Sequence, residues 1–222
     1  MKVLELFSGT HSIGKVVSKR EYDVISLDRD LSGSCPWSDY ESKIHIKEDI
    51  MTWDYTIYQR GEFDIITASP VCLWWSTLRH CWIGRKAPSI HPTETITMKH
   101  LEDDIEKFGR PMVDKVLEII EYFQPKFWWI ENPQTGKMKD YLSDKSFYDV
   151  DYCKYSDWGY KKRTRIWTNI KGFTPQLCNK DCQNIVNGKH KNSSRNNNWD
   201  GKGTLERYRI PEKLIEELID LC

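Results

Sequence analysis

Short apolar runs that end in polar residues alternate with helical patterns from residue 3 to residue 131. The runs are Val3–Phe7, Asp23–Asp28, Phe63–Ala68 and Lys126–Ile130, and the polar positions at or just after their ends include Ser8, Asp28, Cys72 and Glu131. Apolar residues at helical spacing follow the first run and precede the fourth. This alternation predicts an α/β fold with a doubly wound sheet and helices on both faces. In such a sheet, the functional site lies at the carboxyl edge of the strands.

Four further segments complete the expected organisation. Residues 111–123 and 211–221 have the apolar spacing of helices, and each starts at a proline, which favours the first helical turn. Residues 73–110 show no convincing strand, so we expect a long loop with partial helix, of the kind used as a lid or binding loop. Residues 178–203 are rich in Asn, Lys, Gly and Ser and predict an irregular insertion.

Length and composition favour one soluble domain spanning residues 1–222. The longest apolar runs are too short to cross a bilayer, so no membrane association is expected. The first residues enter a strand-like run without the pattern of a signal peptide, and we expect an intracellular monomer, cytoplasmic or nuclear in a eukaryotic host, rather than a secreted protein. Seven cysteines at irregular spacings favour free thiols, a metal site or catalysis over a disulfide framework.

Positive charge is concentrated in one part of the chain. The net charge of the whole sequence is zero, but residues 154–202 contain eight Lys and three Arg against three Asp, a local net charge of +8. The rest of the chain therefore carries −8. A basic stripe on an otherwise acidic protein predicts contacts with the phosphates of a nucleic acid.

Each candidate site residue also has a structural reading when it is taken alone. Cys72, in the stretch SPVCLWWS, is either a reactive thiol or a small apolar residue that fills space. Asp28, at a strand end, is placed either to bind a ribose diol or to cap a helix. Glu131 follows the bulky strand KFWWI, where burying a carboxylate is costly without a partner. The stretch KKRTRIW, with Arg163 and Arg165, also suits an exposed edge strand.

The order of these pieces resembles the cytosine-C5 DNA methyltransferase family across most of the chain. The matching stretches are Phe7-Ser8-Gly9-Thr10-His11, Pro70-Val71-Cys72-Leu73-Trp74-Trp75-Ser76, Glu131-Asn132-Pro133, Lys161-Lys162-Arg163-Thr164-Arg165 and the segment RYRIPEKL. They correspond to the family's cofactor turn, its Pro-Pro-Cys loop, its Glu-Asn-Val strand end, its Gln-X-Arg-X-Arg strand and its last motif. The chain is identified as a small, phage- or virus-like member with a reduced target-recognition region.

The resemblance implies a Rossmann-like sheet that binds S-adenosylmethionine and methylates C5 of a flipped-out cytosine in double-stranded DNA. The implied cofactor-binding residues are Phe7, Ser8, Gly9, Thr10, Asp28, Asp49, Ile50 and Pro70. Cys72 is the implied nucleophile for C6, and Glu131 holds the N3 and amino edge of the base. Arg165 binds O2 with Arg163 beside it, and Ser76 lies at the start of a loop that would clamp the displaced nucleotide.

Three departures from the family pattern have physical consequences. His11 replaces a glycine in the cofactor turn, so the backbone there must avoid a positive φ or accept strain. Val71 and Leu73 flank the cysteine where Pro and Gln are usual. Tyr208 stands where a small polar residue is usual, near the methionine end of the cofactor.

A possible metal site lies in the basic part of the chain. Cys153, Cys178, Cys182 and His190 supply ligands of the type that hold tetrahedral structural zinc, and the alternative is a set of unrelated thiols. Zinc would tie residues 171–206, a small basic insertion, to the rest of the domain. We expect this insertion to act as a reduced recognition element. With Lys162 on the preceding strand, its Lys189, Lys191 and Arg195 would hold phosphates but read few bases.

Two other functions remain open on the sequence. A transfer-RNA cytosine methyltransferase would share the same motifs, although that branch usually carries a Cys-Phe-Thr tripeptide, which this sequence lacks. A catalytically inactive relative that only binds nucleic acid would keep the fold and bind the cofactor without methyl transfer. Labelled methyl transfer to DNA and to transfer RNA discriminates among the three.

Overall fold

A seven-stranded mixed sheet forms the centre of the protein. The structure is a computed structural model that describes residues 1–29, 44–87, 90–192 and 208–222. Across the sheet the strand order is β3-β2-β1-β4-β7-β9-β8. The strands are β1 (Lys2–Leu6), β2 (Asp23–Asp28), β3 (Ile44–Lys47), β4 (Ile65–Ala68), β7 (Phe127–Pro133), β8 (Phe147–Asp151) and β9 (Arg163–Thr168). All neighbouring pairs are parallel except those of β9, which runs antiparallel to both β7 and β8.

The direction in which the strands are added reverses between β1 and β4. The chain first builds outward from β1 to β2 and β3, and then returns to the other side of β1 with β4 and β7. In an open α/β sheet, this switch point leaves a crevice at the carboxyl ends of the two central strands. The doubly wound α/β fold expected from the sequence is therefore confirmed.

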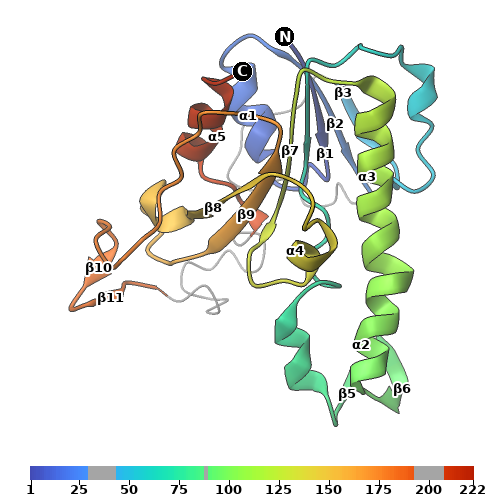
Figure 1. The fold of residues 1–222 in the computed structure, drawn as a ribbon, viewed down its shortest axis with the longest axis vertical. Coiled ribbons are helices and arrows are strands. Elements are labelled where there is room, and N and C mark those ends of the chain that lie inside the picture. Colours follow the sequence, from blue (N-terminus) through green and yellow to red (C-terminus); the bar gives the residue numbers. More distant parts are fainter. Residues whose placement is uncertain (30–43, 88–89, 193–207) are drawn as a thin grey trace.

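Helices cover both faces of the sheet (Figure 1). On one face, α1 (Ser12–Ser18) packs against α5 (Glu212–Ile219), and their apolar side chains contact alternate strand residues such as Val3 and Ile65. On the other face, α3 (Arg110–Phe123) covers Leu4, Leu6 and Ile66, and α4 (Met138–Tyr141) lies beside the same core. This alternation of buried side chains follows from the two-residue period of a strand.

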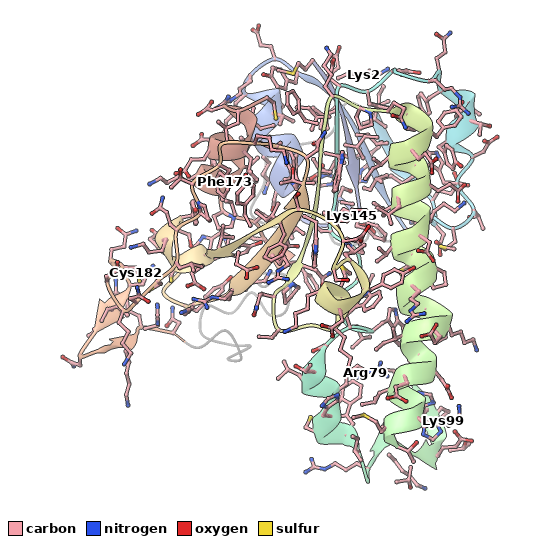
Figure 2. The ribbon with its side chains drawn as sticks, in the orientation of Figure 1. Lys2, Arg79, Lys99, Lys145, Phe173 and Cys182 are labelled. Carbon is pink, nitrogen blue, oxygen red and sulfur yellow. The ribbon has the colours of Figure 1, made fainter. Side chains whose placement is uncertain are left out.

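The segment expected to be a long loop, residues 73–110, is instead a structured arm. It contains the 3₁₀ helix η2 (Thr77–Trp82), the hairpin β5 (Lys86–Ala87) with β6 (His91–Thr95), and α2 (Met98–Asp104). The arm extends past the carboxyl edge of the sheet, at the bottom of Figure 1, and Figure 2 shows Arg79 and Lys99 within it. The expectation of no strand there was wrong, because β5 and β6 are short and largely polar.

A π-helical turn joins the arm to the body of the protein. The turn η3 (Ile105–Gly109) connects α2 to α3 without a break, so the helix begins at Met98 rather than near Pro111. Proline lacks an amide hydrogen and normally ends or bends an α-helix. Here the wider π turn directly precedes Pro111, and such a turn changes the hydrogen-bond pattern locally while the helix continues.

The basic insertion is only partly irregular within the described residues. Ile185–Val186 (β10) and Lys189–His190 (β11) form a small antiparallel hairpin, beside which Cys182 lies in Figure 2. The buried side chain of Asn184 fixes this hairpin to the domain, since its amide donates to the carbonyls of Cys153 and Ser156. Among the helices of the described residues, none has the length and apolar character needed to span a membrane.

Candidate active site at the carboxyl edge of the sheet

Five neighbouring strands deliver the candidate residues to one edge of the sheet. Phe7–Thr10 follow β1, Asp28 ends β2, Asp49 and Ile50 follow β3, Pro70 and Cys72 follow β4, and Glu131 lies near the end of β7. These strands are parallel and adjacent, so their carboxyl ends meet at the same edge. The structure thus brings the predicted cofactor-binding positions together with the segment 70–76, here called the cysteine loop.

The turn after β1 contains three residues with positive φ. Phe7, Gly9 and His11 have φ values of 57°, 42° and 52°. His11 thus adopts the left-handed conformation that a glycine would adopt without strain. The His11 amide donates to the carbonyl of Ser8 at 2.6 Å, and the His11 carbonyl accepts from the first turn of α1 at 3.1 Å. The backbone at His11 is therefore strained, and these two hydrogen bonds maintain its conformation.

Polar groups lie in and beside this turn. Asp28 accepts a hydrogen bond from the Gly9 amide at 2.9 Å, which fixes the carboxylate beside the turn. The Ser8 hydroxyl is buried, and it has no hydrogen-bond partner among the described residues. Asp49 accepts from the Met51 amide at 3.0 Å, and the next side chain, Ile50, is buried in the core. A buried hydroxyl without a partner beside a positioned carboxylate suits a polar ligand such as S-adenosylmethionine.

Aromatic contacts hold the cysteine loop in place. Trp75 is buried, stacks on Tyr141, and accepts a hydrogen bond at its carbonyl from the Lys137 amide at 2.8 Å. Trp74 stacks on Phe108 of the π turn with ring centroids 4.6 Å apart. Cys72 itself is partly exposed. The tryptophans anchor the loop, and the thiol is not merely part of the apolar core.

The end of β7 is tied to the cysteine loop by a buried asparagine. The Asn132 amide donates to the Pro70 carbonyl at 2.8 Å, so Cys72 and Glu131 lie on linked neighbouring strand ends. The sequence analysis assigned no role to this asparagine. Its place directly after Glu131 was the available signal.

Glu131 is a buried carboxylate with two partners from the chain after β8. The hydroxyl of Tyr152, which is fully buried, donates to Glu131 Oε1 at 2.8 Å. Burial, and then the negative charge of Glu131, raise the pKa of Tyr152 well above its ordinary value, so the hydroxyl keeps its proton. Lys162 Nζ lies 3.6 Å from the same carboxylate oxygen. Nothing in the sequence pattern pointed to Tyr152, and Lys162 was expected to contact phosphate.

The two arginines of β9 form paired ion bridges with β8. Arg165 binds both carboxylate oxygens of Asp149 at 2.7 and 2.8 Å, and its guanidinium lies 3.6 Å from the ring centroid of Phe147. Arg163 binds Asp151 at 3.0 and 2.8 Å. In the strand register Arg165 pairs with Asn132, whereas Glu131 pairs with Ile166. Arg165 and Glu131 therefore point to opposite faces of the sheet, and the structure does not bring their side chains together.

The remaining candidates for nucleic-acid contact are distributed over three elements. Ser76 caps η2, where its hydroxyl accepts from the Leu78 amide at 3.3 Å. Lys189 on β11 and the following Lys191 are exposed. Arg195 lies outside the described residues. Of these candidates, the exposed Lys189 and Lys191 therefore belong to the insertion, whereas Lys162 lies beside the Glu131 carboxylate.

The four predicted metal ligands come together. One ligand atom from each of Cys153, Cys178, Cys182 and His190 lies within 4.8 Å of all the others. His190 Nε2 is 3.6 Å from the sulfur of Cys178 and 3.5 Å from that of Cys182. Tetrahedral zinc, with about 2.3 Å to sulfur and about 2.0 Å to nitrogen, would separate sulfur and nitrogen by about 3.5 Å. The donor set and its spacing therefore fit zinc.

The surroundings of this cluster favour the ligand forms of Cys178 and His190, whereas burial raises the pKa of the Cys153 thiol. Burial acts to raise the pKa of the Cys178 thiol, but hydrogen bonds from the Lys180 amide and from Cys153 lower it overall. Burial lowers the pKa of His190, so its imidazole is neutral near pH 7. Asp151 accepts from the Cys178 amide at 2.8 Å and thereby links the cluster to Arg163. Such supporting contacts orient metal ligands.

Comparison with known proteins identifies one close relative. This chain is 40% identical to a protein of Frog virus 3 (isolate Goorha) described as "Probable DNA (cytosine-5)-methyltransferase", over an alignment of 234 residues that covers all of both chains. No family model matches the sequence.

A solved methyltransferase structure shows the same fold at low sequence identity. The Entamoeba histolytica methyltransferase EhMeth superposes with a TM-score of 0.50 at 15% identity, over 80% of this chain and 55% of that one. The S. pombe Dnmt2 methyltransferase gives a TM-score of 0.46 at 14% identity, over 79% and 53% of the two chains. This chain thus spans about half the length of these solved methyltransferases. With full-length identity of 40% to the viral protein, this chain belongs to the DNA (cytosine-5)-methyltransferase family.

Proposed function

We propose that this protein transfers a methyl group from S-adenosylmethionine to C5 of a cytosine in double-stranded DNA, inside the cell and as a monomer. The observation that carries the proposal is the hydrogen bond from Asn132 to the Pro70 carbonyl. It links the Cys72 loop to the strand end that carries Glu131, next to the glycine turn after β1. Family membership supports the same reaction.

Cys72 is the proposed nucleophile. Its thiolate adds to C6 of the cytosine, and the electron pair of the C5–C6 bond makes C5 a carbon nucleophile. When bound, S-adenosylmethionine supplies an electrophilic methyl group. Loss of the C5 proton and of the thiolate then restores the aromatic ring. The anchors at Trp74 and Trp75 would keep the backbone of the Cys72 loop fixed, and Cys72 is partly exposed.

Glu131 is the proposed contact for the N3 and amino edge of the base. Its carboxylate would hold the ring in its N3-protonated form, and this proton offsets the negative charge that the thiolate brings as it adds to C6. Tyr152 donates to Oε1 and so fixes the orientation of the carboxylate. Lys162 near the same oxygen balances its charge in a site where an isolated carboxylate would be costly to bury.

Arg165 and Arg163 are the proposed contacts to base O2 and to the nucleotide near it. Since Arg165 and Glu131 point to opposite faces of the sheet, this proposal requires the base to lie across the edge of the sheet, between the two side chains. In the structure the Arg165–Asp149 pair uses Nε and Nη2, so Nη1 is the donor that we assign to O2. The acidic partners on β8 would hold both guanidinium groups in fixed orientations, which reduces the entropy lost on binding. Ser76, at the start of the arm, would contact the displaced nucleotide.

The cofactor is proposed to lie across the ends of β1, β2, β3 and β4. Asp28 would accept from the ribose hydroxyls, and Asp49 with Ile50 would contact the adenine. The turn Phe7–Thr10 would bring its backbone close to the methionine part, with the Ser8 hydroxyl as a further partner. Pro70 closes this site beside Cys72. The buried Ser8 hydroxyl and the fixed Asp28 carboxylate support this placement.

Residues 171–206 are proposed to act as a reduced recognition element stapled by structural zinc. Cys153 belongs to the domain body, whereas Cys178, Cys182 and His190 belong to the insertion, so one ion would tie the two together. Four protein ligands leave no open coordination position, which suits a structural role. Lys189, Lys191 and Arg195 would then hold DNA phosphates and contribute little to sequence recognition.

Covalent trapping tests the proposal. Wild-type protein incubated with cofactor and duplex DNA that contains 5-fluorocytosine should form a cross-link, since fluorine at C5 blocks release of the thiolate. Cys72→Ser should form none while binding the cofactor with nearly unchanged affinity, because serine is a far weaker nucleophile. The matched control is Cys81→Ser, an exposed cysteine of the arm, which should cross-link normally.

Three results would contradict parts of the proposal. Ordinary turnover by Cys72→Ser would exclude the covalent mechanism. Methyl transfer to transfer RNA but not to duplex DNA would replace the substrate. Cofactor binding without transfer to either nucleic acid would indicate a binding protein that has kept the fold.

A further inference from the structure

The arm has little apolar core of its own to hold its elements together. Within the described part of the arm, the buried apolar cluster consists of Ile96 and Leu101, with Trp82 packed against them. The hairpin β5–β6 is short and has an irregular register between Lys86 and Ala87. A segment that extends from the domain with so small a core benefits from another kind of cross-link.

Two histidines and a glutamate meet where β6 and α2 face each other. One ligand atom from each of His91, Glu94 and His100 lies within 4.8 Å of the other two. The two imidazole rings have centroids 5.0 Å apart, and His100 Nε2 lies 2.9 Å from Glu94 Oε2. A cavity of about 320 Å³ opens beside them, also lined by Asp103, Asp104 and Phe108. It has room for an ion and its bound water.

Neighbouring polar groups orient both rings. His91 Nε2 lies 3.0 Å from Asp104, a buried carboxylate that also pairs with the buried Arg79. A carboxylate that holds one ring nitrogen of a histidine leaves the other to bind a metal, an arrangement common around protein metal sites. His100 Nδ1 accepts from the Thr97 amide at 3.0 Å, so in the structure the proton of the neutral ring is on Nε2, which donates to Glu94. For a metal to bind at Nε2, this proton must move to Nδ1, where the Thr97 hydroxyl, 2.8 Å away, can accept it.

We propose that His91, Glu94 and His100 bind a divalent transition metal ion, such as zinc, that fastens β6 to α2 in the arm. Two imidazoles and one carboxylate are a donor set that zinc and its neighbours in the first transition row accept, with the remaining position taken by water in the cavity. The ion would replace the Glu94–His100 hydrogen bond.

Cobalt(II) titration of the full-length protein tests this site separately from the cysteine cluster. The histidine site contains no thiolate, so it should add visible cobalt absorption without a sulfur-to-cobalt charge-transfer band. In a Cys178→Ser background, one equivalent of such cobalt should still bind. The double variant His91→Ala/His100→Ala in the same background should lose it, and the matched variant His80→Ala, a histidine of the arm outside the cluster, should keep it.

Two further measurements guard against a folding artefact. Glu94→Gln alters one side chain that is 61% exposed, and it should weaken cobalt binding by about tenfold or more while leaving the protein folded. Added zinc should slow amide hydrogen exchange in β6 and α2 of the wild type but not of Glu94→Gln. Equal cobalt uptake by the Cys178→Ser protein with and without the two histidines would overturn the proposal, as would unchanged exchange on adding zinc.

Discussion

The contact between Tyr152 and Glu131 provides a sensitive test of the proposed active site. Tyr152→Phe removes one hydroxyl from a fully buried ring and leaves the shape of the core almost unchanged. The lost hydrogen bond, 2.8 Å long, goes to a carboxylate that is only 6% exposed. Hydrogen bonds to charged groups contribute about 1.5–3 kcal/mol. If this bond orients Glu131 in the transition state, kcat/KM should fall by about 10- to 150-fold.

The lower part of that range is expected, because Lys162 remains 3.6 Å from the same oxygen. The assay is transfer of a labelled methyl group to duplex DNA, with cofactor affinity measured separately by calorimetry. Tyr148→Phe is the matched control, since it also removes a tyrosine hydroxyl. This hydroxyl donates to the Ile170 carbonyl at 3.3 Å rather than to Glu131. A Tyr152→Phe protein with wild-type kcat/KM, or one that loses cofactor affinity to the same extent, would refute the reasoning.

Three more outcomes are expected. Asp28→Ala should weaken S-adenosylmethionine binding by about 1–3 kcal/mol in calorimetry, because it removes the proposed ribose contact and the acceptor of the Gly9 amide; unchanged affinity would place the cofactor elsewhere. Elemental analysis should find about one zinc more per chain in the wild type than in Cys178→Ser, and this variant should bind DNA more weakly while cofactor binding persists. For Asp151, burial opposes ionisation but hydrogen bonds from Arg163 and the Cys178 amide keep the pKa lowered. Its carboxylate should therefore stabilise the fold above about pH 4, and the advantage over Asp151→Asn in urea unfolding should disappear as the pH falls through the lowered folded-state value; a difference that is constant down to pH 2 would contradict this.

The central strands could be predicted from the sequence because each is a short apolar run. Asp23–Asp28 has the predicted bounds, and the runs that became β1, β4 and β7 differ from their predicted bounds by a few residues. The two strands of the central sheet that the sequence analysis missed, β3 and β8, occupy its two edges. Edge strands have one partner and less burial, so their sequences, IHIK and FYDVD, contain polar residues that hide the strand pattern.

The candidate site was predictable only where its residues lie at strand ends. Cys72 and Glu131 could be located because the apolar runs before them are clear. The partners of Arg163 and Arg165 could not, since Asp149 and Asp151 come from β8, and the pairing of β8 with β9 depends on long-range contacts. The four candidate zinc ligands were predictable from residue type, although only folding shows that Cys153 meets the other three.

The continuous helix through η3 has a consequence for how the arm can change in length. Trp74 of the cysteine loop stacks on Phe108 within the π turn, and a side chain at Gly109 would lie only 3.1 Å from Trp75. Deleting or inserting one residue between α2 and this turn would rotate everything on the arm side by about 100° about the helix axis relative to these contacts. The arm would then point in another direction although the cysteine loop was untouched. Changes in its length should therefore be tolerated mainly at the tip, between β5 and β6, where the helical phase is not involved.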